Sequence, residues 1–446
     1  MKKNVSSIVL SFLLVASSVT GSFAANLSKD SNAGVKAYSH VKYLAETIGK
    51  RVQGTEGEYN ARDYIKSVFD GLGYSSTLQE FEIERKIEDN TVDSATSYNV
   101  VATKKGISEM QVIIGAHYDS KVGVGLGADD NASGVAVMLE TAEAIQNIET
   151  PYTIKFVAFG AEESYKDPDT GASNRGLQGS KHYVSQMSAT EISNTVAMIN
   201  LDSLLAGDHM YVYGSEGQQG FVRDQALTIA RRLNLNVITN PGENEEYPIG
   251  TTGDWSDHAP FQEKGIPIAY LEATNWELGD LDGYTQTVKH GEIWHTDNDT
   301  LEFLEAEFPG RVEERLSTFS NLLINLVLNL NQMEIDKLEL RLGNPMFTLN
   351  GEAKTMEKAP IIMNNRTLVP LSLFTDELGF EANLSEDSNE LRLEFRDLTI
   401  SMSRGDLENN FTIHHNHVLV PIRYISNGFN GTLYWMSDAK AIHMVY

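Results

Sequence analysis

A histidine and several carboxylates follow apolar runs of this chain, at points where they could bind a metal ion. The run VIIGAHYD contains His117 at its end, with Asp119 two residues on. KFVAFGAEE ends in Glu162 and Glu163, and TVAMINLDS carries Asp202 near its end. Ligands of open α/β sheets bind at the carboxyl ends of the strands, so three such ends would bring imidazole and carboxylate groups to one crevice. This arrangement is typical of a metal-dependent hydrolase.

Nitrogen and oxygen would have to bind the metal, because the chain contains no cysteine. These ligands suit zinc, and a close pair of metals also needs a carboxylate that bridges them. The glycine-rich stretch SKVGVGLGADDNASG would bring Asp129 back toward the first histidine, and WHTDNDT supplies another. The candidate set therefore has two imidazoles and three carboxylates: His117, Asp129, Glu163, Asp202 and His295.

Both acidic pairs also have a simpler interpretation. Asp129 and Asp130 precede a predicted helix, where adjacent acids often cap, although one could cap while the other binds metal. An acidic pair such as Glu162-Glu163 is by itself more often a solvated turn. Consecutive residues project in different directions, however, so one carboxylate could bind metal while its neighbour faces the substrate water. The position after a buried strand favours this second interpretation.

The elements that must position these groups alternate between short apolar strands and helix-like segments from about 35 to 331. This alternation predicts an α/β domain with a largely parallel central sheet flanked by helices. Apolar residues at helical spacing predict helices over 60–72, 133–146 and 311–330. The expected strands are 98–103, 111–116, 153–159, 195–201, 209–213 and 266–271.

The N-terminus carries the pattern of a secretory leader. Lys2 and Lys3 precede an apolar run and then Ser22-Phe23-Ala24, so residues 1–24 are expected to be a signal peptide, with an uncleaved anchor as the alternative. No stretch is long and apolar enough to be a transmembrane segment, which predicts a secreted, extracellular protein. The formal net charge of −27 argues against nucleic acid as a partner.

A second unit is expected at 334–446, after a catalytic unit at 25–333. TLVPLSLFTDELGF from Thr367 aligns with VLVPIRYISNGFNG from Val418, at an offset of 51 residues, and two copies indicate a duplication. Each copy has a polar turn, then Leu-Val-Pro, a short helix-like segment and an apolar strand. The pattern predicts a small α+β domain built from a two-fold repeat.

This second unit resembles the copper amine oxidase N-terminal-like domain, a module of secreted and surface-associated bacterial proteins. The resemblance implies an adhesive or spacer module that could contact the cell surface or cell wall. Copper chemistry does not follow from it. His414, His415 and His417 are interpreted as turn residues of an exposed hairpin rather than as a metal cluster.

The motifs AHYDS with GADDNASG, GAEE, NLDS, SDHAPF and WHTDNDT occur in this order, after GTEGEYNARDYI and SYNVVA. Over about 36–330 the chain resembles the secreted co-catalytic di-zinc aminopeptidases of peptidase clan MH. The resemblance implies two zinc ions per catalytic domain. His117 and Asp202 would bind one ion, Glu163 and His295 would bind the other, and Asp129 would bridge them.

The resemblance also implies roles for residues that do not bind metal. Glu162 would be the general base, which takes a proton from metal-bound water and returns it to the leaving amine. Asp119 would orient the first histidine by accepting its other N–H. Asp257 and His258 are interpreted either as residues that support the metal ligands from behind or as cleft-wall residues. Trp294 departs from the pattern, because some relatives carry there a tyrosine that can donate a hydrogen bond to the oxyanion.

The expected function is that of a secreted metallo-aminopeptidase acting on peptides with a free N-terminal amine, with large apolar N-terminal residues preferred. A free α-amine can pair with carboxylates beside the metals. Serine-protease chemistry is disfavoured, since no Gly-x-Ser-x-Gly elbow occurs. Aromatic candidates for the specificity pocket are Tyr247, Trp255, Phe261 and Tyr284.

Two groups of alternatives remain. Carboxypeptidases, deacylases and single-zinc aminoacyl cyclases share the expected fold, and the complete ligand set argues only against the cyclase. A non-catalytic surface-binding protein, whose repeat domain acts alone, belongs to a different class. Loss of a ligand would have favoured it, and none is lost.

Overall fold

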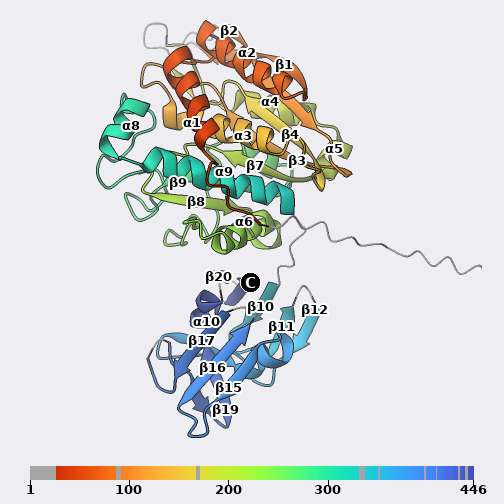
Figure 1. Cartoon of the computed structure of the whole chain (residues 1–446), viewed down its shortest axis with the longest axis vertical. Coiled ribbons are helices and arrows are strands. Elements are labelled where there is room, and N and C mark those ends of the chain that lie inside the picture. Colours follow the sequence, from red (N-terminus) through yellow and green to blue (C-terminus); the bar gives the residue numbers. More distant parts are fainter. Residues whose placement is uncertain are drawn as a thin grey trace, which may run out of the picture.

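The computed structural model describes residues 27–86, 92–166, 171–330, 337–349, 352–395, 398–407, 409–429, 432–436 and 440–445. The predicted signal peptide and the boundary expected near 334 lie outside these residues. The described residues form an α/β domain and a β-rich C-terminal domain, each with its own hydrophobic core (Figure 1). None of their helices combines the length and apolar character that crossing a membrane requires.

A nine-stranded sheet forms the centre of the α/β domain. Its middle strands are parallel and run in the order β4 (Tyr152–Phe159), β3 (Ser108–His117), β7 (Thr195–Leu201) and β9 (Ile268–Thr274). The outer strands are antiparallel to their neighbours: β1 (Ser75–Lys86), β2 (Val92–Lys104), β5 (Tyr165–Lys166), β6 (Ser173–Asn174) and β8 (His209–Gly214). The predicted fold class and strands are confirmed.

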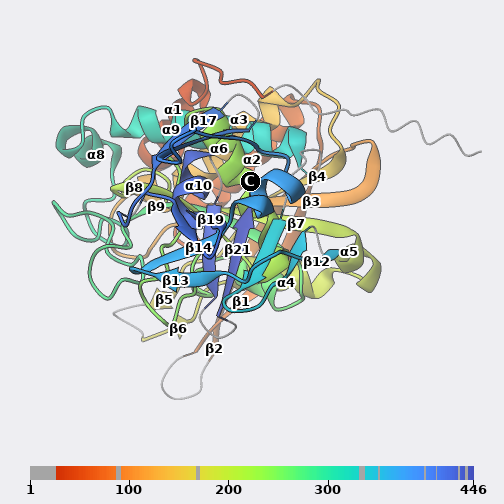
Figure 2. The same ribbon diagram turned by 90° about the horizontal axis from the view of Figure 1, so that it is seen from below.

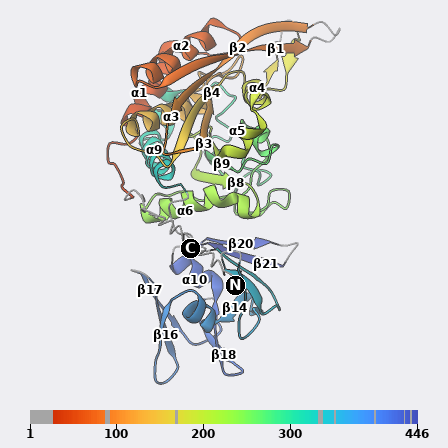
Figure 3. The ribbon, with the colours of Figure 1, turned by 90° about the vertical axis from the view of Figure 1, so that its right-hand side faces the viewer.

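Helices cover both faces of this sheet, which explains why the middle strands are apolar along most of their length. Figure 3 shows α1, α3 and α9 on one side and α4 and α5 on the other. The first layer contains α1 (Val35–Lys42), α2 (Glu56–Gly71), α3 (Ser133–Ala144), α6 (Phe221–Arg232) and α9 (Arg311–Asn329). The second contains α4 (Gln178–Gln186), α5 (Ala189–Asn194) and α7 (Ala259–Gln262). Smaller elements are η1 (Tyr43–Ile48), η2 (Ala128–Ala132), η3 (Gly217–Gly220) and α8 (Leu301–Glu307).

The C-terminal domain contains three antiparallel sheets. One combines β10 (Lys337–Arg341), β11 (Met346–Leu349), β12 (Glu352–Thr355), β20 (Thr432–Met436) and β21 (Ala441–Val445). A second combines β13 (Ile361–Met363), β14 (Arg366–Pro370), β18 (Thr412–His414) and β19 (His417–Pro421). The third combines β15 (Glu381–Leu384), β16 (Glu390–Phe395) and β17 (Leu398–Ser403), and η4 (Leu373–Glu377) and α10 (Ile422–Gly428) complete the domain.

The two sequence repeats pair with each other. β14 of the first copy lies beside β19 of the second (Figure 2). The two strands are antiparallel, with Val369 opposite Val420. Each of these strands also closes a hairpin whose two turn residues have positive φ, Asn364-Asn365 in one copy and His415-Asn416 in the other. Positive φ at both central positions is what a tight two-residue hairpin turn requires. The duplication is therefore visible in the structure, and His415 lies in a hairpin turn as predicted.

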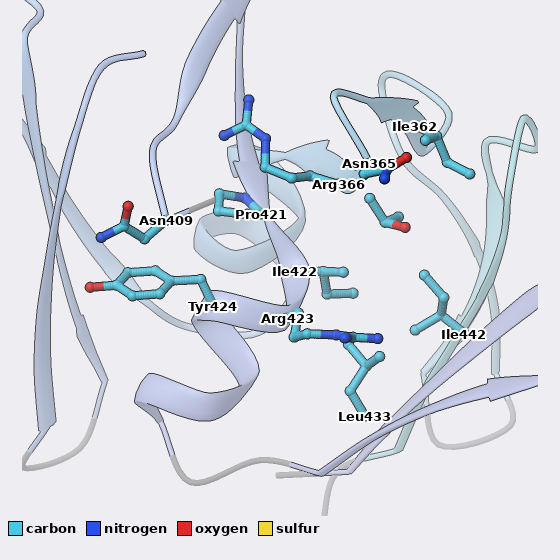
Figure 4. A pocket seen from close by; sticks show the side chains of 11 residues that line it. Ile362, Asn365, Arg366, Asn409, Pro421, Ile422, Arg423, Tyr424, Leu433 and Ile442 are labelled. Carbon is cyan, nitrogen blue, oxygen red and sulfur yellow. The ribbon is translucent and has the colours of Figure 1, made fainter. Parts of the chain in front are cut away.

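A cavity of about 480 Å³ lies between the two copies (Figure 4). Asn365 and Arg366 line it from the first copy, and Ile422 and Tyr424 from the second. His414 and His417 are not turn residues as predicted: they face each other as the paired ends of β18 and β19. Each has an ordinary partner, since His414 Nδ1 lies 2.9 Å from Lys358 Nζ and His417 Nδ1 lies 3.2 Å from a Glu357 carboxylate oxygen. The groups of side chains with metal-binding geometry in the described part of the chain lie in the α/β domain instead.

Candidate metal centre

The carboxyl ends of the parallel strands converge on one site, as the sequence predicts. His117 is the last residue of β3, and Asp202 directly follows β7. Glu162 and Glu163 follow β4 after a short turn in which Ala161 has a φ of 53°. His295 comes from the loop that precedes α8. The strand order therefore places next to one another groups that are far apart in the sequence.

Two triads of ligand atoms form at this site, and both contain Asp130. In the first, His117 Nε2 lies 3.1 Å from Asp130 Oδ1 and 3.3 Å from Asp202 Oδ1. In the second, His295 Nε2 lies 3.2 Å from Asp130 Oδ2 and 3.2 Å from Glu163 Oε2. The two oxygens of Asp130 thus face different triads, which is the geometry of a carboxylate that bridges two metal ions.

Asp129, the residue expected to bridge, has a different environment. Its Oδ1 accepts hydrogen bonds from the backbone N–H groups of Leu205 (2.6 Å) and Ala206 (3.0 Å), and its Oδ2 accepts one from Gln286 Nε2 (2.6 Å). These bonds turn the carboxylate away from the triads and toward the loop after β7. The structure therefore corrects the sequence analysis by one residue: Asp130 bridges the triads, and Asp129 stabilises a neighbouring loop.

Asp299, which the sequence analysis missed, determines which of the two acids, Asp129 or Asp130, points toward the triads. Asp299 is buried, and its two oxygens accept hydrogen bonds from the backbone N–H groups of Asp129 (2.6 Å) and Asp130 (3.1 Å). The backbone of the acidic pair is thereby fixed, and with it the direction of each side chain. The only sequence signal was the second acid after the histidine in WHTDNDT.

Arg51 holds the glycine-rich loop that leads to the acidic pair. Its fully buried guanidinium donates hydrogen bonds to the carbonyl oxygens of Tyr118, Leu126 and Gly127, each at 2.8 Å. Gly127 has a φ of 64°, and a Cβ there would lie 2.6 Å from the carbonyl oxygen of Asp130. Glycine is therefore required where the loop turns back to the site. No sequence motif points to this arginine.

Asp119 connects two of the strand ends. Its carboxylate oxygens accept hydrogen bonds from the backbone N–H groups of Glu162 (2.9 Å) and Glu163 (3.1 Å), and its Oδ1 lies 3.5 Å from His117 Nδ1. The residue is fully buried. Its position suits the predicted role of aiming the imidazole, and it also holds the backbone of the acidic pair, which the sequence analysis did not anticipate.

The electrostatics of the site favour a bound cation. Burial alone would lower the pKa of His117, yet the negative charge of Asp202 and Glu162 raises that pKa well above its usual value. Burial likewise opposes a charged His295, but hydrogen bonds to Asp130 and Glu163 raise its pKa to about 11. In the absence of a cation, protons on the imidazoles balance the acids.

The donor set fits zinc. It offers imidazole nitrogen and carboxylate oxygen, and no thiolate exists in the chain. Glu163 Oε1 is buried without a hydrogen-bond partner among the described residues. A buried carboxylate oxygen is costly to leave unpaired, so the site is built to receive positive charge.

A pocket of about 370 Å³ opens beside the triads. Of the aromatic residues expected to shape it, Trp255 and Tyr284 line the pocket, and both are substantially exposed. Tyr247 packs edge-on against Trp255, whereas Phe261 belongs to the core. Trp294 also lines the pocket, and its indole Nε1 has no hydrogen-bond partner in the described part of the chain.

A further acid, Glu272, lines the same pocket and was missed by the sequence analysis. It lies near the carboxyl end of β9, the fourth parallel strand, and is 1% exposed. Burial raises its pKa to about 8. The available signal was a single carboxylate inside the otherwise apolar run IPIAYLEA.

The SDHAPF motif lies behind the site. His258 is fully buried, stacks on Tyr270 with ring centroids 4.9 Å apart, and its Nε2 donates a hydrogen bond to the carbonyl oxygen of Gly253. Ser256 donates a hydrogen bond of 2.7 Å to Asp202 Oδ2. Neither Asp257 nor His258 belongs to a triad or lines the pocket, and both are fully buried.

Family models match both domains of the chain. The model of peptidase family M28 matches residues 99–320, which contain every residue of the two triads. The model of the copper amine oxidase N-terminal domain matches residues 330–393.

Comparisons with individual relatives agree with the match to the peptidase family model. The alkaline phosphatase isozyme conversion protein of Escherichia coli is 35% identical over 322 residues, which cover 66% of this chain and 90% of the relative. An aminopeptidase of Bacillus subtilis is 33% identical over 220 residues, covering 48% of this chain and 41% of the relative. The solved structure of a zinc aminopeptidase from Bacillus subtilis superposes with a TM-score of 0.54 at 21% identity, over 68% of this chain and 95% of that one. At that identity the structural likeness shows the fold alone.

Proposed function

Because this chain belongs to peptidase family M28, we propose that it is a zinc-dependent aminopeptidase that hydrolyses the N-terminal peptide bond of peptides with a free amine. The observation that carries the proposal is the position of Asp130, with one oxygen toward each imidazole. A pocket beside these groups offers space for a substrate side chain.

Two zinc ions fit the two triads. His117 and Asp202 are the proposed ligands of one ion, Glu163 and His295 those of the other, and Asp130 replaces Asp129 as the proposed bridge. When bound, such a pair lowers the pKa of a water molecule and stabilises negative charge on the carbonyl oxygen of the substrate.

Glu162 is the proposed general base. Its Oε2 lies 3.9 Å from His117 Nε2, and it lines the pocket without belonging to a triad. Burial raises the pKa of Glu162 well above its usual value, as is favourable for a group that takes a proton from the attacking water and returns it to the leaving amine. Asp119 acts through other groups, since it positions His117 and the backbone of Glu162.

The proposed specificity for a free amine is based on the carboxylates that line the pocket. Glu162 and Asp202 both line the pocket and could pair with an α-ammonium group. A carboxypeptidase would instead need a cation for the terminal carboxylate. Of the two pocket cations, Lys121 already contacts Glu163 (3.1 Å) and Ser164 (2.7 Å), whereas Arg175 is exposed at the pocket. C-terminal substrates therefore test the carboxypeptidase alternative by experiment. A deacylase would not need the free amine and is distinguished by experiment.

A substrate panel tests this proposal directly. Zinc-loaded protein is expected to hydrolyse amino acid amides and peptides with a free N-terminus, and to leave their N-acetylated counterparts and C-terminal substrates intact. A chelator should abolish the activity and added zinc should restore it, because the proposed mechanism depends on the metal ions to activate the water and to stabilise charge on the carbonyl oxygen. Equal rates on N-acetylated and free-amine substrates would contradict the aminopeptidase proposal, and release of acetate from the N-acetylated substrates would identify a deacylase.

Secretion, and contact of the C-terminal domain with a cell surface or cell wall, remain part of the proposal, supported by the leader pattern and by the match to the second family model. The metal centre and its pocket consist entirely of α/β-domain residues.

Deletion of 334–446 is therefore expected to leave kcat/KM for small amide substrates within about twofold of the full chain, since the hydrophobic cores are separate. Steady-state kinetics of both proteins measure this, with circular dichroism as the control for folding. Loss of activity in a folded, zinc-loaded deletion variant would show that the C-terminal domain completes the site.

A further inference from the structure

Glu272 is a buried residue of the pocket wall, and its carboxylate has no role in the proposed reaction. Residues at or just after the carboxyl ends of the three other parallel strands, β3, β4 and β7, form the metal centre. Glu272, near the carboxyl end of β9, lies instead in the wall of the pocket beside it. Its side chain lines the same cavity as Glu162 and His295, so a substrate bound at the centre has access to it.

The hydrogen-bond partners of Glu272 include no cation. Tyr270 donates a hydrogen bond to Oε1 and Tyr213 donates one to Oε2, both at 2.8 Å. No Lys, Arg or His of the described residues forms an ion pair with it. Two phenol donors stabilise the carboxylate but supply no positive charge, and an acid buried in this way is costly unless a cation joins it. Each oxygen retains a lone pair for one more donor.

The rest of the pocket suits a long side chain that ends in a cation. Trp255, Tyr284 and Trp294 give it aromatic walls. Aromatic rings pack against the methylene groups of lysine and arginine, and their faces attract a cation. Arg175 also lines the pocket, but it is exposed to water, where its charge is screened, whereas Glu272 is not.

We propose that Glu272 binds the cationic side chain of the substrate's N-terminal residue, so that the enzyme prefers peptides that begin with lysine or arginine. This inference rests on the proposed aminopeptidase function. It revises the expectation that the substrate begins with a large apolar residue. The aromatic walls explain affinity for the apolar methylene groups of the substrate side chain, and Glu272 adds a preference for a positive charge at the end of that side chain.

A competing role for Glu272 is to bind the α-amine, which every substrate carries. Matched pairs of substrates separate the two roles. Norleucine has the stem of lysine without the ammonium group, and citrulline has nearly the shape of arginine without the charge. A side-chain contact affects only the charged member of each pair, whereas an α-amine contact affects both members equally.

The experiment measures kcat/KM of the zinc-loaded full chain for the amides of lysine, norleucine, arginine and citrulline. The wild-type protein is expected to favour each cationic substrate over its neutral partner by about 10- to 100-fold, as a buried charge-assisted hydrogen bond allows. Glu272→Gln should reduce both ratios to within about threefold of unity while it changes norleucine turnover by less than about threefold. Glutamine keeps the size of the side chain and can still accept from one tyrosine.

Asp254→Asn is the matched control, because Asp254 lines the same pocket but is exposed. It should change the lysine-to-norleucine ratio by less than about threefold. If Glu272→Gln does not fold, competitive inhibition of the wild-type protein by free lysine and by norleucine gives the same comparison, with lysine expected to bind more tightly.

Three results would overturn the inference. They are a wild-type lysine-to-norleucine ratio of unity or below, equal losses for all four substrates in Glu272→Gln, and an equal effect of Asp254→Asn. If the protein hydrolyses norleucine amide and lysine amide equally well, the result contradicts this inference but not the aminopeptidase proposal. Failure to hydrolyse any free-amine substrate would contradict both the aminopeptidase proposal and this inference.

Discussion

Glu162→Gln is expected to lower kcat by about 10²- to 10⁴-fold, the usual contribution of a general base. Glutamine has the same size but cannot accept the proton of the attacking water. Glu162 lies outside both triads, so the variant should still bind zinc with the wild-type stoichiometry, and KM should change little. Steady-state kinetics together with metal analysis of the same preparation measure both effects.

A matched control is Glu109→Gln, because Glu109 is exposed near the amino end of β3, away from the strand ends that form the site. It should leave kcat unchanged. Wild-type activity of Glu162→Gln would exclude this residue as the base. Loss of zinc from the variant would show that Glu162 is a ligand and that the assignment of the two adjacent acids must be exchanged.

Asp130→Asn is expected to lower both the zinc content and kcat/KM, the latter by about 10³-fold or more, because a pair of metals contributes several kcal/mol to transition-state stabilisation. The neutral amide cannot bridge two ions, and both triads lose a shared ligand. Asp129→Asn should instead retain zinc, while the weakening of its hydrogen bonds to Leu205, Ala206 or Gln286 costs about 1–3 kcal/mol of stability.

The two variants carry the same chemical change at adjacent positions, so each is the control for the other. Metal stoichiometry and urea unfolding distinguish the expected results: loss of metal for one, loss of stability with metal retained for the other. Normal zinc content in Asp130→Asn, with depletion in Asp129→Asn, would restore the assignment made from the sequence.

The sequence predicted the features that depend on local pattern. Apolar runs of strand length, each with a polar residue past its end, predict buried parallel strands, and parallel strands bring their carboxyl ends together. This is why His117, Glu163 and Asp202 could be identified before their neighbours in space were known. The hairpins of the repeat domain were likewise marked by short polar turns of Asn and His.

The sequence could not decide between Asp129 and Asp130, because that choice depends on backbone direction. Hydrogen bonds from a distant carboxylate, Asp299, and a buried guanidinium, Arg51, determine it. Glu272 was missed for a related reason: one acid in an apolar strand looks like a satisfied core residue until the tertiary structure shows that it faces a pocket.

The contact between Asp299 and the acidic pair joins segments separated by 170 positions in the chain. An unfinished or partly folded chain therefore has no metal site and, on the proposed mechanism, no hydrolytic activity. On the proposed function, hydrolysis would begin only after the segment that carries His295 and Asp299 has joined the segments that carry the other site residues. Completion of the α/β fold would then serve as the activation step.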